Sequence, residues 1–299
     1  MGLGSRLRGG AGMIAVLVTG CAQPATRGGI VSVNPCADAL LVRLVAPERI
    51  AAISHYSQDR AATSIPLGVA RRFRATGGTA EEVIALRPSL VLASTFTPAA
   101  TRDAYRRAGL RVLFLDSPVT VAASVAQVRE VAAAVGEARK GEEMAESITD
   151  ALRLQRRLEP SCDGAGCDGS RSPSERVPNA PQPSLGPSPR APSALLLISG
   201  DLANGSGTLL DELMTRAGLR NAAADYGLRY TGRVPLEVLA AKPPAIVIAP
   251  DRGGRTAALR RTLLPDTPQA TFPRQLINCG GPSIPSALAR LRAIRASLP

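Results

Sequence analysis

Tryptophan is absent from this chain of 299 residues, aromatic residues make up only 3%, and His55 is the sole histidine. A core must therefore be built from alanine, valine, leucine and isoleucine, and the hydrophobic share of 45% supplies enough of them. One histidine cannot provide the several converging ligands that a bare zinc or manganese ion needs. The sequence thus predicts neither a metal site made by the protein's own side chains nor a resident cofactor.

Lysine is also scarce, since only Lys140 and Lys242 occur, and the net charge of +12 comes almost entirely from arginine. Such a charge is compatible with a nucleic acid, an anionic membrane or an acidic ligand. The arginines are scattered, with no run of five and no interleaved aromatic residues. This distribution argues against a nucleic-acid partner and indicates a background preference for arginine.

The sequence carries neither the G-x-S-x-G pattern of a serine hydrolase nor a phosphate-binding P-loop. His55 stands beside Ser54 and Ser57, which supplies only two of the three members of a catalytic triad. We therefore expect a binding protein that is not an enzyme. Two alternatives stay open: a hydrolase-like enzyme of unknown type, and a lipoprotein that senses or scaffolds without transport.

The first 21 residues have the pattern of a signal peptide. Arg6 and Arg8 precede an apolar stretch, residues 11–18, which is too short to span a bilayer. The segment ends in Val-Thr-Gly-Cys at residues 18–21, which resembles a bacterial lipobox. This pattern predicts that Cys21 is lipidated; the alternative is a buried first strand with an incidental cysteine.

Four further cysteines would then occupy an oxidising compartment, where disulfides form. Cys162 and Cys167 lie close enough in sequence to close a small loop. Cys36 and Cys279 lie near opposite ends of the chain, and a bond between them would tie the first strand region to the last. The spacing alone leaves the connectivity open, and a thiolate metal site is disfavoured because no C-x-x-C occurs.

Apolar runs of strand length alternate with helical patterns along most of the chain. Strands are expected at residues 30–33, 49–54, 90–93, 112–115, 195–198 and 246–249. Helices are expected at residues 38–45, 98–108, 119–135, 209–217 and 284–296. This alternation predicts an α/β fold built on parallel sheets.

Residues 137–158 form one long helical pattern, and residues 159–192 are rich in Pro, Ser and Gly. The second stretch cannot bury enough apolar surface to offset its ordering entropy, so we expect a disordered insert. The predicted division of the chain is a signal peptide (1–21), an N-terminal lobe (22–136), a bridging helix (137–158), the insert (159–192) and a C-terminal lobe (193–299).

A weak internal repeat supports two lobes. Residues 82–93 read EVIALRP followed by SLVLA, and residues 237–249 read EVLAAKP followed by PAIVIA. Each reads as a short helix ended by proline and followed by a buried strand. Two such units at matching places indicate two similar lobes, with the long helix as a stiff connector.

An ordered series of short segments resembles the helical-backbone class of substrate-binding proteins, which serves the ABC importers of cobalamin and iron chelates. The segments are SVNPCAD (32–38), AISH (52–55), GTAEEVIALRP (78–88), AGLRV (108–112), GSGTLLDEL (205–213), AGLRN (217–221) and GRVPLE (232–237). The resemblance implies two Rossmann-like lobes with parallel sheets, joined by a long bridging α-helix, and a ligand cleft between them.

The resemblance also implies partners and location. Glu81 and Glu237 would pair with the importer's permease subunits, and Glu82 is the alternative to Glu81. A purely structural explanation also stays open, because the helix dipole alone stabilises carboxylates at the beginning of a helix. The protein would be periplasmic, anchored to a bacterial membrane through its lipid.

The ligand implied is a metal chelate, such as a corrinoid, a ferric siderophore or haem, because a chelate brings its own metal ligands. In open α/β sheets, ligands bind outside the carboxyl ends of strands. The expected ligand-binding residues are Ser54, His55, Tyr56, Ser57, Thr95, Phe96, Ser199, Gly200, Asn204, Tyr226, Tyr230 and Arg252. His55 or Tyr56 would ligate the metal axially; a hydrogen-bonded structural role is the alternative.

Overall fold

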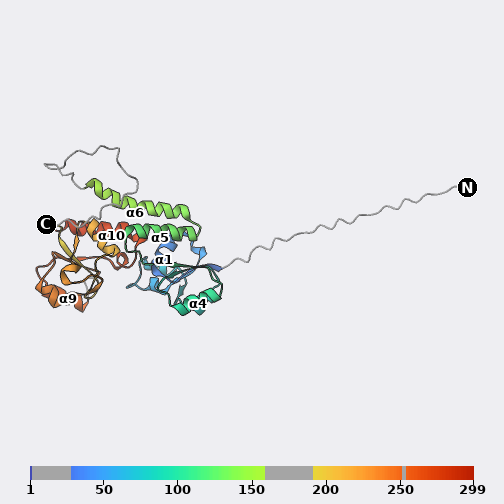
Figure 1. Cartoon of the computed structure of the whole chain (residues 1–299), viewed down its shortest axis with the longest axis horizontal. Coiled ribbons are helices and arrows are strands. Elements are labelled where there is room, and N and C mark those ends of the chain that lie inside the picture. The colour runs from blue at the N-terminus through green and yellow to red at the C-terminus, as the bar shows by residue number, and fades with distance from the viewer. Residues whose placement is uncertain (2–27, 159–190, 251–253) are drawn as a thin grey trace.

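The computed structural model describes Met1 and residues 28–158, 191–250 and 254–299. Two sheets lie side by side, and long helices run along one edge of them (Figure 1). These helices are α5 (Val121–Ala134), α6 (Ala138–Leu158) and α10 (Ile284–Ala296). We call the half around the first sheet the first lobe and the half around the second sheet the second lobe.

The first sheet has five strands, all parallel, in the order β3-β2-β1-β4-β5. They are β1 (Gly28–Ser32), β2 (Ile50–Ser54), β3 (Ala75–Thr76), β4 (Pro88–Ser94) and β5 (Val112–Leu115). In the central strands β1 and β4 three of five and five of seven residues are buried and none is exposed, as expected for a parallel sheet covered on both faces.

The helices of the first lobe follow its strands in the usual α/β alternation. They are α1 (Pro35–Leu44), α2 (Leu67–Ala70), α3 (Ala80–Ala85) and α4 (Ala99–Arg107), with 3-10 turns η1 (Pro47–Arg49) and η2 (His55–Gln58). Helix α1 begins where it does because Asn34 accepts hydrogen bonds from the backbone N–H groups of Cys36 and Ala37, with Pro35 in the first turn.

The second sheet runs β11-β10-β6-β7-β9, with β8 also paired to β6. Its strands are β6 (Ser193–Ser199), β7 (Leu202–Ala203), β8 (Arg220–Asn221), β9 (Gly232–Arg233), β10 (Ile246–Ala249) and β11 (Gln269–Thr271). It is not wholly parallel, which corrects the expectation: β7 runs antiparallel to β6 and β9. The chain reverses at Gly200, whose φ of +57° favours glycine.

The second lobe adds three helices besides α10: α7 (Leu209–Arg216), α8 (Leu236–Ala241) and α9 (Arg255–Leu263). Its 3-10 turns are η3 (Ala222–Tyr226), η4 (Arg274–Leu276) and η5 (Gly281–Ser283). The units α3–β4 and α8–β10 are the two copies of the sequence repeat, and each is a short helix followed by a buried strand.

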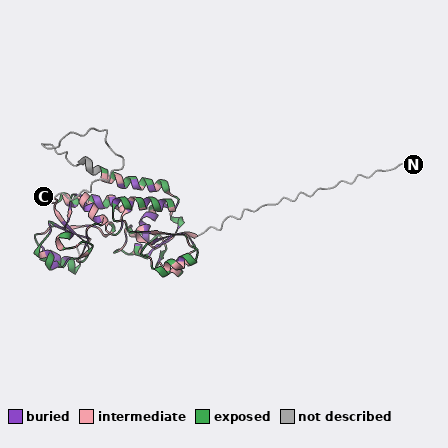
Figure 2. Ribbon diagram, in the orientation of Figure 1, coloured by how far each residue is buried: buried purple, intermediate pink, exposed green. Residues whose placement is uncertain are grey.

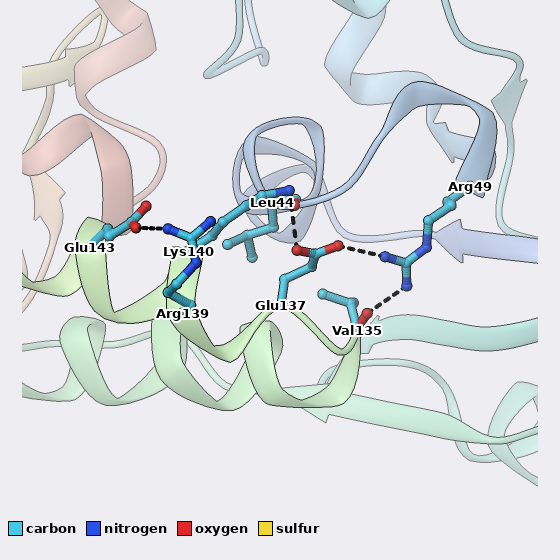
Figure 3. Close-up of polar contacts among 7 residues, drawn as sticks. All are labelled: Leu44, Arg49, Val135, Glu137, Arg139, Lys140 and Glu143. Atoms are coloured by element: carbon cyan, nitrogen blue, oxygen red, sulfur yellow. Dashed lines mark hydrogen bonds and ion pairs between the residues drawn. The ribbon is translucent and has the colours of Figure 1, made fainter.

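Helix α6 is fixed to the first lobe at its beginning (Figure 3). Glu137 forms ion pairs with Arg49 at 2.7 Å and with Lys140 at 3.1 Å. Lys140 also donates to the backbone oxygen of Leu44 at 2.9 Å, at the end of α1. Because α6 packs against α5 and against α10, it bridges the two lobes as the long helical pattern predicted.

One large apolar cluster runs through both lobes. It includes Leu40 and Val128 of the first lobe, Ile148 of α6, and Leu213 and Leu288 of the second lobe. In Figure 2, α5 and the coloured part of α6 alternate between buried and exposed residues, as amphipathic helices do. The lobes are therefore packed onto a common layer of helices, not merely linked by a tether.

The fold class is confirmed as two α/β lobes with a bridging helix. The five-part division of the chain stays a prediction; residues 2–27, with Cys21, and residues 159–190, with Cys162 and Cys167, lie outside the described residues. Among the described helices, none combines the length and the apolar character that crossing a membrane requires.

Candidate ligand-binding cleft

A cavity of about 480 Å³ lies between the lobes, and both lobes line it. Its first-lobe wall is made by residues 33–36, which follow β1, by Ser94 at the end of β4, and by residues 116–119, which follow β5. The strand order of the first sheet reverses between β1 and β4. The cavity therefore lies at the place where open α/β sheets bind ligands.

The second lobe closes the cavity from the opposite side. Its contributions are Ile198 on β6, Asn204 after β7, the first turns of α7, and residues 276–281, which precede α10. The wall is mainly apolar, with scattered amide and hydroxyl groups. Asp116 is the one charged side chain among the described residues that line it.

The loop after β1 is held rigidly. The hydroxyl of Ser32 donates to the backbone oxygen of Asn34 at 3.1 Å, and the side chain of Asn34 caps α1. Asn34, Pro35 and Cys36 thus form a wall whose position is set by the beginning of α1.

Asp38, on α1, holds the neighbouring turn η2 in place through hydrogen bonds. Its side chain is fully buried, and Oδ2 accepts hydrogen bonds from Ser57 Oγ at 2.6 Å and from the backbone N–H of Ser54 at 3.0 Å. Burial raises the pKa of Asp38 to about 7, although the hydrogen bonds from nearby serines oppose this shift. The turn held in this way carries Tyr56 to the edge of the cavity.

Two of the predicted ligand-binding residues, Tyr56 and Asn204, line this cavity. Ser54 and Ser57 are buried beneath it and support η2. His55 is exposed but outside the lining; its Nδ1 lies 3.2 Å from the backbone oxygen of Thr76, and its ring packs against that of Tyr56 with centroids 4.0 Å apart.

Thr95 and Phe96 follow Ser94, the lining residue at the end of β4, and both are exposed. The hydroxyl of Thr95 donates to Asp116 Oδ1 at 3.3 Å, which ties the β4 and β5 loops together. Tyr230 is 80% exposed, and its backbone lies against Gly205, next to Asn204. These side chains belong to the surroundings of the cleft.

The remaining predicted ligand-binding residues lie elsewhere. Ser199 and Gly200 line a separate groove of about 540 Å³, because the turn into β7 directs them there. Tyr226 donates to the backbone oxygen of Lys242 at 2.7 Å, at the end of α8, and is not part of the cleft lining. Arg252 lies outside the described residues.

The sequence reasoning missed the loops after β1 and β5, helix α7 and residues 276–281. The order of strands in a sheet cannot be read from the chain, so the central position of β1 was not apparent. One signal was available, because the structure joins Cys36 and Cys279 in a disulfide across 243 residues, and both cysteines line the cavity. That pair marks the two segments that meet in the cleft.

The predicted docking glutamates differ in their surroundings. Glu82 accepts hydrogen bonds from Thr76 Oγ1 at 2.8 Å and from the backbone N–H of Gly77 at 2.7 Å, and these bonds hold its pKa below the ordinary value. Glu81 and Glu237 are exposed in the first turns of α3 and α8. Glu237 also borders the groove that contains Ser199 and Gly200.

Within residues 28–158, 191–250 and 254–299, no group of three or more His, Cys, Asp and Glu side chains could hold a metal ion. Ser57 Oγ donates to Asp38, so it has no histidine partner of the kind that a catalytic serine needs.

Residues 30–157 match the family of periplasmic binding proteins. No curated protein matches the chain in sequence.

Solved structures share the fold over nearly the whole chain. The periplasmic heme-binding protein RhuT from Roseiflexus sp. RS-1 has 21% identity and a TM-score of 0.65, covering 90% of this chain and 97% of its own. The heme-binding protein HutB of Vibrio cholerae has 16% identity and a TM-score of 0.65, covering 89% and 98%. The vitamin B12 binding protein BtuF of Vibrio cholerae has 14% identity and a TM-score of 0.64, covering 90% and 97%. The two-lobed fold that the resemblance implied is confirmed.

Proposed function

We propose that this chain is the extracytoplasmic substrate-binding component of an ABC importer, which captures a metal chelate between its lobes and delivers it to the permease. The observation that carries the proposal is the cavity of about 480 Å³ enclosed by both lobes at the carboxyl ends of β1, β4 and β5. A cleft between two lobes can enclose a ligand on both sides, as a delivery protein must.

The surroundings of the cleft support a planar, largely apolar ligand. Tyr56, Phe96, Val119 and Tyr230 are large hydrophobic side chains that stay more than half exposed, and the first three lie on or beside the first-lobe wall. Exposed aromatic and aliphatic groups around a concave site are typical of ligand recognition. Haem and the macrocycle of a corrinoid fit this description, and the similar structures named above bind heme or vitamin B12.

We propose that the chelate supplies its own metal and that one protein group completes the coordination. Tyr56 lines the cavity, whereas His55 lies outside the lining with Nδ1 near the backbone oxygen of Thr76. We therefore favour Tyr56 over His55 as the axial ligand, and we assign His55 the structural role.

Delivery requires docking, for which Glu81 and Glu237 are the candidates. Glu82 already accepts hydrogen bonds from Thr76, on β3, and from Gly77, so it ties α3 to the end of β3. Glu81 is exposed beside it, which favours Glu81 as the carboxylate that meets arginines of the permease. A lipid on Cys21 would hold the protein at the periplasmic side of the membrane close to that permease.

A thermal-shift screen of the purified chain with hemin, cobinamide, cobalamin and a ferric siderophore tests the proposal, because a ligand that binds only the folded state raises its melting temperature. We expect saturable binding of one class without turnover. Chemical conversion of a bound compound would instead support a hydrolase-like enzyme, and no response to any chelate would support a sensor or scaffold.

A further inference from the structure

The two lobes are connected at a second place besides α6. After β11 the chain leaves the second sheet, and residues 276–281, which we call the strap, reach the first lobe before α10 begins. Helix α10 then packs against α7 of the second lobe and against α6. The strap thus belongs to the second lobe in sequence and lies on the first lobe in space.

Three bonds fix the strap to three separate elements of the first lobe. Asn278 Nδ2 donates to the backbone oxygen of Ala62 at 2.9 Å. Cys279 is joined to Cys36 at the beginning of α1. The backbone N–H of Gly281 donates to Ser124 Oγ, on α5, at 2.7 Å, in a buried position. One bond alone would allow the strap to pivot, but three bonds to different elements fix its orientation.

The glycines of the strap allow an unusually close approach. A Cβ atom on Gly280 would lie 2.6 Å from Ser124 Oγ of the first lobe and 2.7 Å from Leu209 Cδ2 of the second. Gly281 has a φ of +62°, which other residues rarely adopt. Gly280 therefore fills the junction of the lobes with backbone only, so the width of this junction is set by the strap.

The same segment is part of the binding surface. All six strap residues line the cavity, as do Cys36 and Leu209, which they contact. A change in the position of the strap would move both the floor of the cleft and the distance between its walls.

We infer that the strap and its disulfide hold the cleft at one fixed width. Cys36, Asn278 and Cys279 act as positioning residues, so ligand affinity depends on them. The part of this inference that concerns affinity rests on the proposed function; the part that concerns the lobes does not. If only a fraction of molecules keeps the correct width, the apparent dissociation constant rises by the inverse of that fraction.

Two variants test the strap, each in the full chain. Cys36→Ser with Cys279→Ser removes the covalent bond, and Asn278→Ala keeps it but removes the hydrogen bond to Ala62. Thr262→Ala is the matched control, because it removes a side-chain hydrogen bond on α9, away from the cleft.

The first readout needs no ligand. Spin labels carried by non-cysteine amino acids at Arg107 and Leu259, exposed positions on α4 and α9, report the distance between the lobes. We expect one narrow distance distribution in the unmodified chain and the control, and a broadened one in both strap variants. Unchanged distributions in both strap variants would overturn the inference.

The second readout is the dissociation constant for hemin and for cobinamide, measured well below the melting temperature. We expect it to rise about tenfold in the double cysteine variant, less in Asn278→Ala, and not in the control. A lower melting temperature with unchanged dissociation constants would show a structural role only and would overturn the inference. If the unmodified chain binds neither probe, nor cobalamin or a ferric siderophore in the thermal-shift screen, the proposed function fails, and the distance distributions alone decide the strap.

Discussion

The buried carboxyl group of Asp38 makes the stability of the protein depend on pH in a calculable way. Burial raises its pKa from 3.8 to about 7, and no charged group contributes to the shift. The folded state therefore holds the Asp38 proton more tightly than the unfolded state does. The free energy of unfolding should fall as the pH rises from about 4 to about 7. Above pH 7 Asp38 is ionised in both states, and the loss of stability is complete.

The size of the effect follows from the shift. A change of about three pKa units corresponds to about 4 kcal/mol, at about 1.4 kcal/mol per unit. Asp38→Asn cannot ionise, so it lacks this cost, while its side-chain oxygen can still accept from Ser57 and Ser54. Relative to the unmodified chain, the variant should become more stable by about 4 kcal/mol between pH 4 and pH 8.

Urea denaturation of both proteins at unit steps from pH 4 to pH 8 measures this difference directly. Asp59→Asn, at an exposed position of the first lobe, keeps Asp38 and is the control: its free energy of unfolding should fall with pH in parallel with that of the unmodified chain. Parallel stability curves for Asp38→Asn and the unmodified chain would refute the reasoning, because they would mean that Asp38 ionises equally in the folded and unfolded states.

Tyr56→Ala should raise the dissociation constant for the bound chelate by about tenfold or more, as measured by fluorescence or absorbance titration, because it removes an aromatic anchor from the cavity edge; an unchanged constant would count against its role. Glu81→Arg combined with Glu237→Arg should leave ligand affinity intact and abolish uptake into cells, and normal uptake would disprove docking through these carboxylates. Gly141→Ala should destabilise the protein by about 1–3 kcal/mol in urea denaturation, since the new methyl group would collide with Ala132 between α6 and α5; unaltered stability would show that this helix pair can relax.

Much of the fold was predictable because buried strands and amphipathic helices leave local patterns. The ranges predicted for β5, β10 and α10 coincide with the observed Val112–Leu115, Ile246–Ala249 and Ile284–Ala296. Strands β7 and β9 were missed, because each has two residues and exists through pairing with partners distant in sequence. Such strands carry no periodicity of their own.

The site was less predictable than the fold for the same reason. Sequence reasoning placed the ligand after β2, β4, β6 and β10, whereas the first-lobe wall of the cavity is made mainly by the loops after β1 and β5, with Ser94 on β4 and Tyr56 after β2. Which strand ends face the cleft depends on the order of strands in the sheet, and that order arises only on folding. Tyr56 reaches the cavity because Asp38, on a different element, holds the turn that carries it.

The central claim is that both lobes hold the ligand in one cleft. Hydrogen–deuterium exchange of the full chain, with and without hemin or cobinamide at saturating concentration, tests it most directly. We predict simultaneous protection of residues 33–36, 116–119 and 276–281, with no protection of α4 or α9. Protection restricted to one lobe, or located away from these three segments, would contradict the claim.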